Sequence, residues 1–386
     1  MVDLKNWLNQ QREKGGLRSL RPVSRRGKGH LTLAGDEREL IDFSSNDYLA
    51  LAEHPTLIAA AQQALNQFGA GSGASRLMSG DLAVHHELEE AVAQLKGKEA
   101  ALTFGCGYMA NTGIIPALVG RHDLIFSDRL NHASIHDGCR LSGARLVRFR
   151  HNDLNHLEDL LREKQGHGSA LIVVESIYSM DGDRCPLREL VALKERFGCL
   201  LMVDEAHGTG VYGPNGGGVI EEDGVSSGVD LAMGTFGKAL GSYGAYVAGS
   251  AEMMEYLLNR ARSFIFSTAL PPPVAAASLA AVQLVREEPS LRSELHEKIA
   301  LFKTLLRTGG YTGDLGPSQI IPVLIGESGA ALHKGELLKA RGIFATAVRP
   351  PTVPVGTARL RFSITRHHSI TDLTLAAKSL LEIMDT

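Results

Sequence analysis

Short apolar segments alternate with amphipathic stretches along the middle of this 386-residue chain, and this alternation limits its fold more than any other feature. The segments are apolar on both faces, which is typical of buried strands, and helical patterns such as HHELEEAVAQLKG and PLRELVALKERFG separate several of them. Strands that alternate with helices build a mostly parallel sheet covered on both sides. The pattern therefore predicts an α/β domain with a mostly parallel seven-stranded sheet, formed by residues 101–104, 124–127, 145–149, 170–175, 199–205, 230–235 and 246–249.

A second, smaller domain is expected after the three prolines at 271–273. A long helix rich in alanine and leucine is predicted from these prolines to about Leu306, and β-rich segments follow up to residue 365. A chain of this length is long for one hydrophobic core. The expected organisation is an amino-terminal segment (1–48), a large domain (49–272) and a smaller α+β carboxy-terminal domain (273–386).

Composition and charge exclude several classes of protein. A net charge of -3 with 44% hydrophobic residues is typical of a globular protein and gives no reason to expect nucleic acid or a membrane as partner. The four cysteines form no C-x-x-C pair, and the first ten residues have no apolar signal-peptide core, so we expect a cytoplasmic protein. Eight lysines and arginines lie between residues 5 and 28. They form either a solvated surface or a landing site for an acidic or phosphate-bearing substrate carrier.

A glycine-rich turn follows the first strand of the predicted sheet, in FGCGYMAN at 104–111. Free backbone N–H groups at the start of a helix form a favourable phosphate site. Gly105, Gly107 and Ala110 also fit the dinucleotide pattern G-x-G-x-x-G/A. A similar match at residues 69–74 follows a helix instead of a strand, which shows that this pattern alone is weak.

Two further turns place an acid, an imidazole and an amine after successive predicted strands. Asp204 and His207 lie in VDEAHGTG, and Lys238 lies in MGTFGKALG among small and apolar residues. A poorly solvated carboxylate favours a cationic partner, such as the protonated ring nitrogen of pyridoxal phosphate (PLP), and a desolvated lysine amine is a usable nucleophile and base. The letters DEAH also occur in RNA helicases, but the chain has no GK followed by Ser or Thr to bind a triphosphate, so we reject that class.

Two other positions fit the same chemistry. His132 follows the predicted strand 124–127, where an imidazole could stack on an aromatic ring. Arg349 lies in a proline-stiffened loop, which suits an arginine that grips a carboxylate with two hydrogen bonds. Arg359 and Arg361 alternate along the following strand, and we expect them to be structural.

The chain resembles the α-oxoamine synthases in nine motifs that occur in the order usual for that family: NDYLALAEHP, GSGASR, FGCGYMAN, NHASIHDG, SIYSMDGD, VDEAHGTG, GTFGKALG, STALPPP and RPPTVPVGTARLR. The motifs run from about residue 40 to 370, so the resemblance covers most of the chain. It implies a PLP-dependent transferase of fold type I, the aspartate-aminotransferase fold. Ala50 and Ala74 replace glycines that are common in the family, and neither change removes a reacting group.

The resemblance also implies a role for each site residue. Lys238 would hold PLP as a Schiff base, Asp204 would pair with the ring nitrogen, and His132 would stack on the ring. These three and His207 are the expected catalytic residues. The remaining cofactor contacts are implied at Gly107, Tyr108, Ser179, Thr235, Ser267 and Thr268. Family members are homodimers, and the last two residues would reach the phosphate bound by the partner subunit. Substrate contacts are implied at Arg18, Asn46, Arg349 and Thr352.

The implied reaction joins L-alanine to a pimeloyl thioester, carried by coenzyme A or by an acyl-carrier protein, with loss of CO2. Three alternatives remain open at this point. The nearest is a sister synthase that uses glycine and makes 2-amino-3-oxobutyrate or 5-aminolevulinate. The second is an NAD-dependent oxidoreductase that uses the glycine turn, and the third is a binding module that keeps only the fold.

Overall fold

The computed structural model describes residues 2–13, 16–164 and 168–384. The chain divides into two compact units. The large unit comprises Leu51–Ser179 and Asp183–Ser293, and the small unit comprises Met1–Ala50, Met180–Gly182 and Glu294–Thr386. The amino-terminal segment thus belongs to the same unit as the carboxy-terminal part of the chain.

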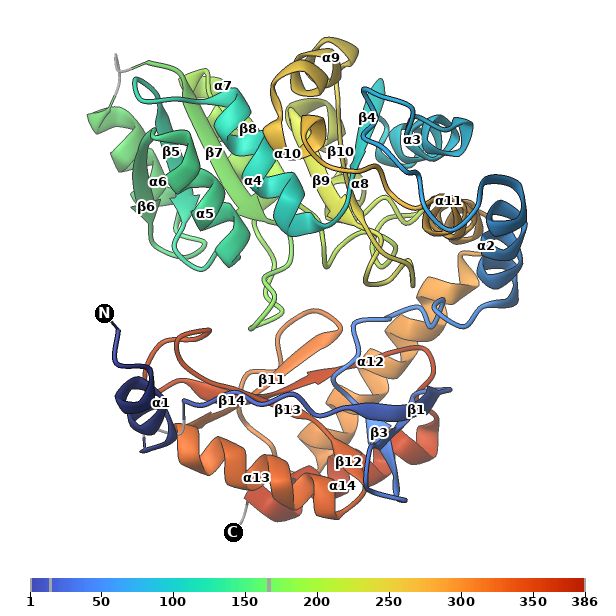
Figure 1. Ribbon diagram of the computed structural model, residues 1–386. Helices are drawn as coiled ribbons and strands as arrows, with labels where there is room; N and C mark the ends of the chain where they lie inside the picture. Colours follow the sequence, from blue (N-terminus) through green and yellow to red (C-terminus); the bar gives the residue numbers. More distant parts are fainter. Residues whose placement is uncertain (1, 14–15, 165–167, 385–386) are drawn as a thin grey trace. The chain divides into compact units, whose positions relative to one another are not determined.

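A seven-stranded sheet forms the centre of the large unit, in the order β4-β10-β9-β8-β7-β5-β6 (Figure 1). Its strands are β4 (Ala100–Phe104), β5 (Leu124–Asp128), β6 (Arg145–Phe149), β7 (Ala170–Glu175), β8 (Leu200–Asp204), β9 (Leu231–Thr235) and β10 (Ala245–Gly249). The five strands from β9 to β6 are parallel, and β10 is antiparallel to both of its neighbours. The predicted mostly parallel sheet is confirmed.

Helices connect these strands and cover the sheet: α2 (Pro55–Phe68), α3 (Ala83–Lys96), α4 (Gly107–Leu118), α5 (Ala133–Ser142), α6 (Leu154–Glu163), α7 (Leu187–Phe197), α8 (Val219–Glu222), the 3-10 turn η1 (Ser226–Gly228), α9 (Ala251–Arg260), α10 (Arg262–Ile265) and α11 (Pro272–Glu287). Their ends follow local chemistry. The side chains of Asp153 and Ser250 cap the first turns of α6 and α9, and Gly143 and Gly198 end α5 and α7 in the left-handed conformation.

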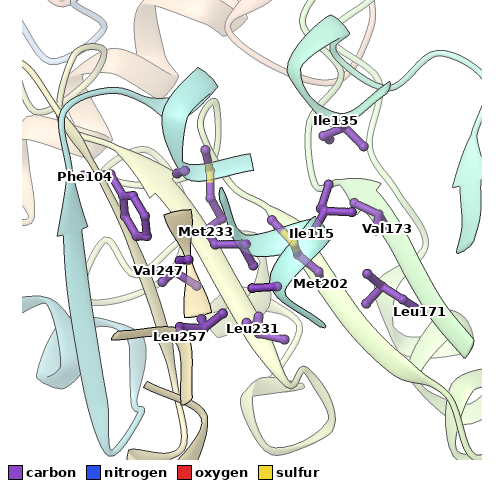
Figure 2. Close-up of a cluster of buried hydrophobic side chains, with 14 of the residues drawn as sticks. Phe104, Ile115, Ile135, Leu171, Val173, Met202, Leu231, Met233, Val247 and Leu257 are labelled. Atoms are coloured by element: carbon purple, nitrogen blue, oxygen red, sulfur yellow. The ribbon is translucent and has the colours of Figure 1, made fainter. Parts of the chain in front are cut away.

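Apolar side chains from the sheet and from α4, α5 and α9 form one buried core, on the face of the sheet that these helices cover. Figure 2 shows Phe104, Met202 and Met233 from the strands packed near Ile115 of α4 and Leu257 of α9. Strands that are buried on both faces must be apolar throughout, which explains why their sequences show no polar alternation. The core fixes α4 and α5 against the strands whose carboxyl ends carry the candidate site.

The long helix predicted from 271–273 to Leu306 is wrong, because the chain forms two helices there. Helix α11 ends at Glu287, and α12 (Ser290–Thr308) begins after Pro289. Proline lacks an N–H group and restricts the residue before it to extended conformations, so Glu288 leaves the helix at ψ 79°. Helix α11 packs on α2 and α3 of the large unit, and residues of α12 from Glu294 onward belong to the small unit.

Two sheets and several helices form the small unit. Strands β1 (Val23–Gly27), β2 (His30–Leu33), β3 (Glu39–Asp42) and β12 (Ile343–Phe344) form one sheet, and β11 (Ile320–Gly326), β14 (Ala358–Ser363) and β13 (Thr346–Val348) form the other. The helices are α1 (Leu4–Glu13), α12, α13 (Ser328–Ala340) and α14 (Ile370–Met384). Among the described helices of the whole chain, none is long and apolar enough to span a bilayer.

Candidate active site

Polar side chains gather where the parallel strands of the large unit end. Glu175, Asp204 and Thr235 are the last residues of β7, β8 and β9, which are neighbours in the sheet. Ligands of such sheets bind beyond the carboxyl ends of the strands. These three ends, and the turns that follow them, define the candidate site.

Asp204 is a buried carboxylate, with 5% of its surface exposed. Its Oδ1 accepts a hydrogen bond from the backbone N–H of Ala206 at 2.9 Å, and its Oδ2 accepts one from Nδ2 of Asn111 at 3.0 Å. Donors on both oxygens fix the orientation of the carboxylate. Asp204 can therefore present a negative charge to a cationic group such as a protonated ring nitrogen.

Lys238 and His207 meet although they lie in turns after different strands. The Nζ atom of Lys238 is 2.7 Å from Nε2 of His207. Lys238 is partly buried between the buried residues Phe236 and Ala239, and only 4% of His207 is exposed. Gly241, with φ 62°, donates its N–H to the carbonyl of Lys238 and closes the turn. The structure brings the predicted amine and imidazole into direct contact.

His132 is the N-cap residue of α5 and lies next to the same charges. Its backbone N–H donates to Oε1 of Glu175 at 2.5 Å, and its Nδ1 lies 2.7 Å from Oγ of Ser134. Burial lowers the pKa of His132, and the positive charge of Lys238 adds to this effect, whereas Asp204 opposes it. The imidazole therefore favours its uncharged form.

Glu175 is a second buried acid beside Asp204, and it is not among the site residues predicted from the sequence. The two residues are paired in the register of β7 and β8, so their side chains emerge on the same face. Burial and the neighbouring charge of Asp204 raise the pKa of Glu175 well above its usual range. Its position at the carboxyl end of the strand ALIVVE was the available signal in the sequence.

The glycine turn between β4 and α4 has the form expected of a phosphate site. Helix α4 begins at Gly107, and the side chain of its N-cap residue, Cys106, makes no capping hydrogen bond. A Cβ atom at Gly107 would lie 3.1 Å from Cε of Met233, so the turn packs closely on β9. Tyr108 is 45% exposed, and its hydroxyl donates to Asp137. The first N–H groups of α4 are thus available to an anion.

The other predicted phosphate contacts lie on two loops. The hydroxyl of Thr235 donates to the carbonyl of Gly244 at 2.7 Å, so it would have to rotate to donate to a phosphate oxygen. Ser267 and Thr268 follow α10 and line a small pocket with Gly105 of the glycine turn. Ser179 follows β7 and is the last residue of the large unit before Met180.

Three of the four predicted substrate contacts line one cavity of the small unit. This cavity has a volume of about 880 Å³, and Arg18, Arg349 and Thr352 are among its lining residues. Nη2 of Arg18 donates to Oγ1 of Thr352 at 3.0 Å. Burial lowers the pKa of Arg349, and the positive charges of Arg18 and Arg21 lower it further. Such a cluster of guanidinium groups favours an anionic ligand.

The fourth predicted contact, Asn46, lies with a different group of residues. Its Oδ1 accepts from the hydroxyl of Tyr48 at 3.1 Å and from Nη2 of Arg361 at 3.2 Å. Arg361 is 8% exposed and also donates to Oγ of Ser363 at 2.7 Å. Arg359 is also buried and pairs with Asp181, so both arginines of β14 bind other residues of the small unit.

The residues of the large unit fit PLP. Asp204 offers a fixed negative charge, Lys238 a partly buried amine, and the start of α4 a set of N–H donors for phosphate. Among the described residues, no group of three or more His, Cys, Asp or Glu side chains could hold a metal ion.

Comparisons with known proteins agree with this geometry. The family described as aminotransferase class I and II matches residues 38–380. The 8-amino-7-oxononanoate synthase of Geobacter sulfurreducens is 52% identical over 378 residues, which cover 97% of this chain and 96% of that protein. A solved structure of serine palmitoyltransferase from S. paucimobilis with a bound PLP–myriocin aldimine is 30% identical, covers 100% of this chain and 99% of that one, and has a TM-score of 0.93. A structure of 8-amino-7-oxononanoate synthase from Francisella tularensis is 29% identical, covers 90% of this chain and 98% of that one, and has a TM-score of 0.77.

Proposed function

The chain belongs to the aminotransferase class I and II family and, within it, to the 8-amino-7-oxononanoate synthases, and from this premise we propose how its residues join L-alanine to a pimeloyl thioester. It is a PLP-dependent acyltransferase of biotin biosynthesis with a fold of type I. The products are 8-amino-7-oxononanoate, CO2 and the free thiol carrier. Because the chain belongs to this family, we no longer consider an NAD-dependent oxidoreductase that would bind its cofactor at the glycine turn.

When bound, PLP supplies an electron-poor ring that stabilises negative charge at the Cα atom of the amino acid. Lys238 would hold it covalently, Asp204 would pair with the ring nitrogen, and the start of α4 would bind its phosphate. His207 and Ser179 would lie near its phenolic oxygen, and His132 would lie against its face. Gly107, Tyr108 and Thr235 would complete its binding.

Lys238 is the residue that we assign to proton transfer. Its amine would remove the proton from Cα of alanine and would later return a proton to the product. The contact of 2.7 Å with His207 supports this role, because it fixes the amine in one position within a partly buried turn. This contact, in a chain that is 52% identical to a known synthase, is the observation that carries the proposal.

The cavity of the small unit suits the two carboxylates of the substrates. Arg349 would bind the carboxylate of alanine, and Arg18 and Thr352 would contact the pimeloyl group. Apolar side chains also line the cavity and could cover the methylene chain: Leu17, Leu20, Leu332, Phe344 and Val348.

We further propose that the protein is a cytoplasmic homodimer. In this dimer, Ser267 and Thr268 would reach the phosphate bound by the partner subunit. Free thiols at all four cysteines fit a reducing compartment.

An assay of the purified holoenzyme tests this function. L-Alanine and glycine are each offered with pimeloyl-CoA, pimeloyl-acyl-carrier protein, acetyl-CoA and succinyl-CoA, and CO2 release and the amino ketone product are measured. We expect turnover with alanine and a pimeloyl thioester. Faster turnover of glycine with acetyl-CoA or succinyl-CoA would instead identify a glycine-using sister enzyme. The ratio of rates with the two pimeloyl carriers identifies the donor.

A further inference from the structure

A chain of hydrogen bonds joins the imidazole of His132 to the carboxylate of Asp204. Nδ1 of His132 lies 2.7 Å from Oγ of Ser134, and this hydroxyl lies 2.9 Å from Nδ2 of Asn111. The same Nδ2 lies 3.0 Å from Oδ2 of Asp204. Asn111 and Ser134 are each 1% exposed, so water does not compete for the bonds that join Ser134, Asn111 and Asp204, whereas His132 lies at the exposed end of the chain of bonds. We call this set of bonds, from His132 through Ser134 and Asn111 to Asp204, the relay. It connects α5, α4 and β8.

The direction of each bond follows from the number of hydrogen atoms available. Nδ2 of Asn111 carries two hydrogens and donates one to Asp204 and one to Ser134. The opposite orientation of the amide would place its oxygen against a carboxylate oxygen. Although Oδ1 of Asn111 is buried and has no hydrogen-bond partner among the described residues, the amide keeps this orientation, which shows that Asp204 decides it.

The hydroxyl and the backbone N–H of Ser134 together determine the role of Nδ1 of His132. Since the hydroxyl of Ser134 accepts from Asn111, its own hydrogen is free to donate to Nδ1. The backbone N–H of Ser134 also points at Nδ1, at 3.2 Å. Two donors on one ring nitrogen require that this nitrogen is an acceptor. The neutral imidazole therefore carries its proton on Nε2.

Close packing of two helices makes this arrangement possible. A Cβ atom at Gly138 of α5 would lie 2.6 Å from the backbone oxygen of Asn111 in α4. Glycine at this position lets the two helices approach, which brings Ser134 within reach of Asn111. The carboxylate of Glu175 also holds His132, because it accepts a hydrogen bond from the backbone N–H of His132.

We propose that Asn111 and Ser134 are positioning residues that orient the carboxylate of Asp204 and hold His132 as the neutral tautomer protonated on Nε2. The part of the proposal that concerns the cofactor rests on the proposed function. An uncharged imidazole can lie against the electron-poor ring of PLP, whereas an imidazolium there would repel it. The tautomer itself does not depend on the function.

The charges around His132 agree with this assignment. The partial burial of the ring and the charge of Lys238 oppose protonation, while Asp204 and Asp137 favour it, and Glu175 faces the backbone of His132 from β7. The pKa of His132 is lowered in sum. Loss of the donor from Ser134 would remove a further interaction that only the neutral ring can make.

Histidine ring nitrogen NMR tests the relay directly. The protein is labelled with 15N-histidine and measured with and without PLP, and the His132 signals are identified by their loss in His132→Asn. We expect an unprotonated Nδ1 and a protonated Nε2 in the wild type in both forms. A wild-type ring protonated on Nδ1 would overturn the proposal. Because the cofactor-free protein is measured as well, this result is independent of catalysis.

Ser134→Ala, Ser134→Thr and the control Ser142→Ala complete the experiment. Ser142 also lies on α5, where its hydroxyl donates to the carbonyl of Cys139, so its loss changes the same helix outside the relay. In Ser134→Ala we expect the pKa of His132 to rise by about 0.5–1, because one hydrogen bond changes an equilibrium about 3- to 10-fold. The apparent pKa of the acidic limb in the plot of kcat/KM against pH should rise by the same amount. Ser134→Thr should restore both pKa values.

Equal pKa values and pH profiles in Ser134→Ala and Ser142→Ala would overturn the role of the relay. Asn111→Ala supplies a second test, because it breaks both links at once. It should raise the pKa of His132 and weaken PLP binding, measured by the absorbance of the bound cofactor. Normal NMR results in a protein that fails the alanine assay would leave the relay intact and count against the proposed function alone.

Discussion

The Nζ atom of Lys238 lies 2.7 Å from Nε2 of His207, although the two residues are 31 positions apart in the chain. Each residue lies in the turn that follows one of two neighbouring parallel strands, β9 and β8. The parallel register of these strands brings both turns to the same edge of the sheet. The contact is therefore a consequence of strand order, and it sets the position of the amine on which the chemistry depends.

Loss of the Lys238 amine should abolish the reaction. We expect Lys238→Ala to reduce kcat by at least about 10³-fold, because no other group can replace both the covalent attachment and the base. PLP should still associate, without a borohydride-reducible linkage to the protein. Release of CO2 from alanine and mass spectrometry after reduction measure both effects. Turnover at the wild-type rate would refute the assignment.

Removal of the Asp204 charge should preserve the fold and impair the chemistry. Asp204→Asn keeps the size of the side chain but removes the negative charge that would hold a protonated ring nitrogen. We expect kcat/KM to fall by about 10²–10³-fold, as for other preorganised electrostatic contacts. The melting temperature of the cofactor-free protein should change little by comparison. Activity within a factor of two of the wild type would show that the charge is not needed.

Arg18 should act on substrate affinity. Because a hydrogen bond to a charged group contributes about 1.5–3 kcal/mol, Arg18→Ala should raise KM for the pimeloyl thioester by about 10- to 100-fold with a smaller change in kcat. Arg38→Ala is the control, since Arg38 is exposed and pairs with Asp36. Steady-state kinetics with varied thioester measure the difference. An equal KM in the two variants would place the substrate elsewhere.

A buried ion pair joins Lys96 of α3 to Glu205 of the VDEAHGTG turn and should be important for stability. The side chains of Lys96 and Glu205 are 1% and 0% exposed, and Oε1 of Glu205 also accepts from the backbone of Ile220 at 3.0 Å. Lys96→Met would leave a buried carboxylate without its cation, so we expect a loss of about 3–5 kcal/mol in the free energy of unfolding. The double variant Lys96→Met/Glu205→Gln should recover part of it. Urea denaturation measures both, and an unchanged midpoint in Lys96→Met would contradict the prediction.

His151 should make stability fall at alkaline pH. Its Nδ1 and Nε2 lie 2.9 Å and 2.6 Å from carboxylate oxygens of Asp128 and Asp183. Burial opposes the charge, but these two acids raise the pKa of His151 from 6.5 to about 9. A raised pKa stabilises the fold below pH 6.5, and this contribution, at most about 3 kcal/mol, is lost as the pH rises from 6.5 to about 9.

The comparison of wild type with His151→Gln isolates this contribution. The difference in their free energies of unfolding should be largest at pH 6 and should shrink by pH 9.5. Urea titrations at both pH values measure it. A difference that stays constant over this range would show that His151 is not protonated between the two acids.

The strands and the chemistry of the turns after them could be predicted because they depend on local patterns. Apolar runs on both faces indicated the seven strands, and Asp204, His207 and Lys238 were found because each follows such a run. The helix break at Pro289 was missed, since the alanine-rich pattern before it resembles one long helix. Asn111, Ser134 and Glu175 were not selected, because a single asparagine, serine or glutamate carries no signal until its partners are known.

The sequence by itself determined the strands, the turns and the types of reacting group, because the order of apolar and polar residues is sufficient for these. Only the tertiary structure decided which groups touch. The contact of Lys238 with His207 and the relay from His132 to Asp204 join residues that are 31 and 72 positions apart. Such contacts depend on the register of parallel strands and on the close approach of α4 and α5 at Gly138. Packing sets these distances, and no local pattern in the chain encodes them.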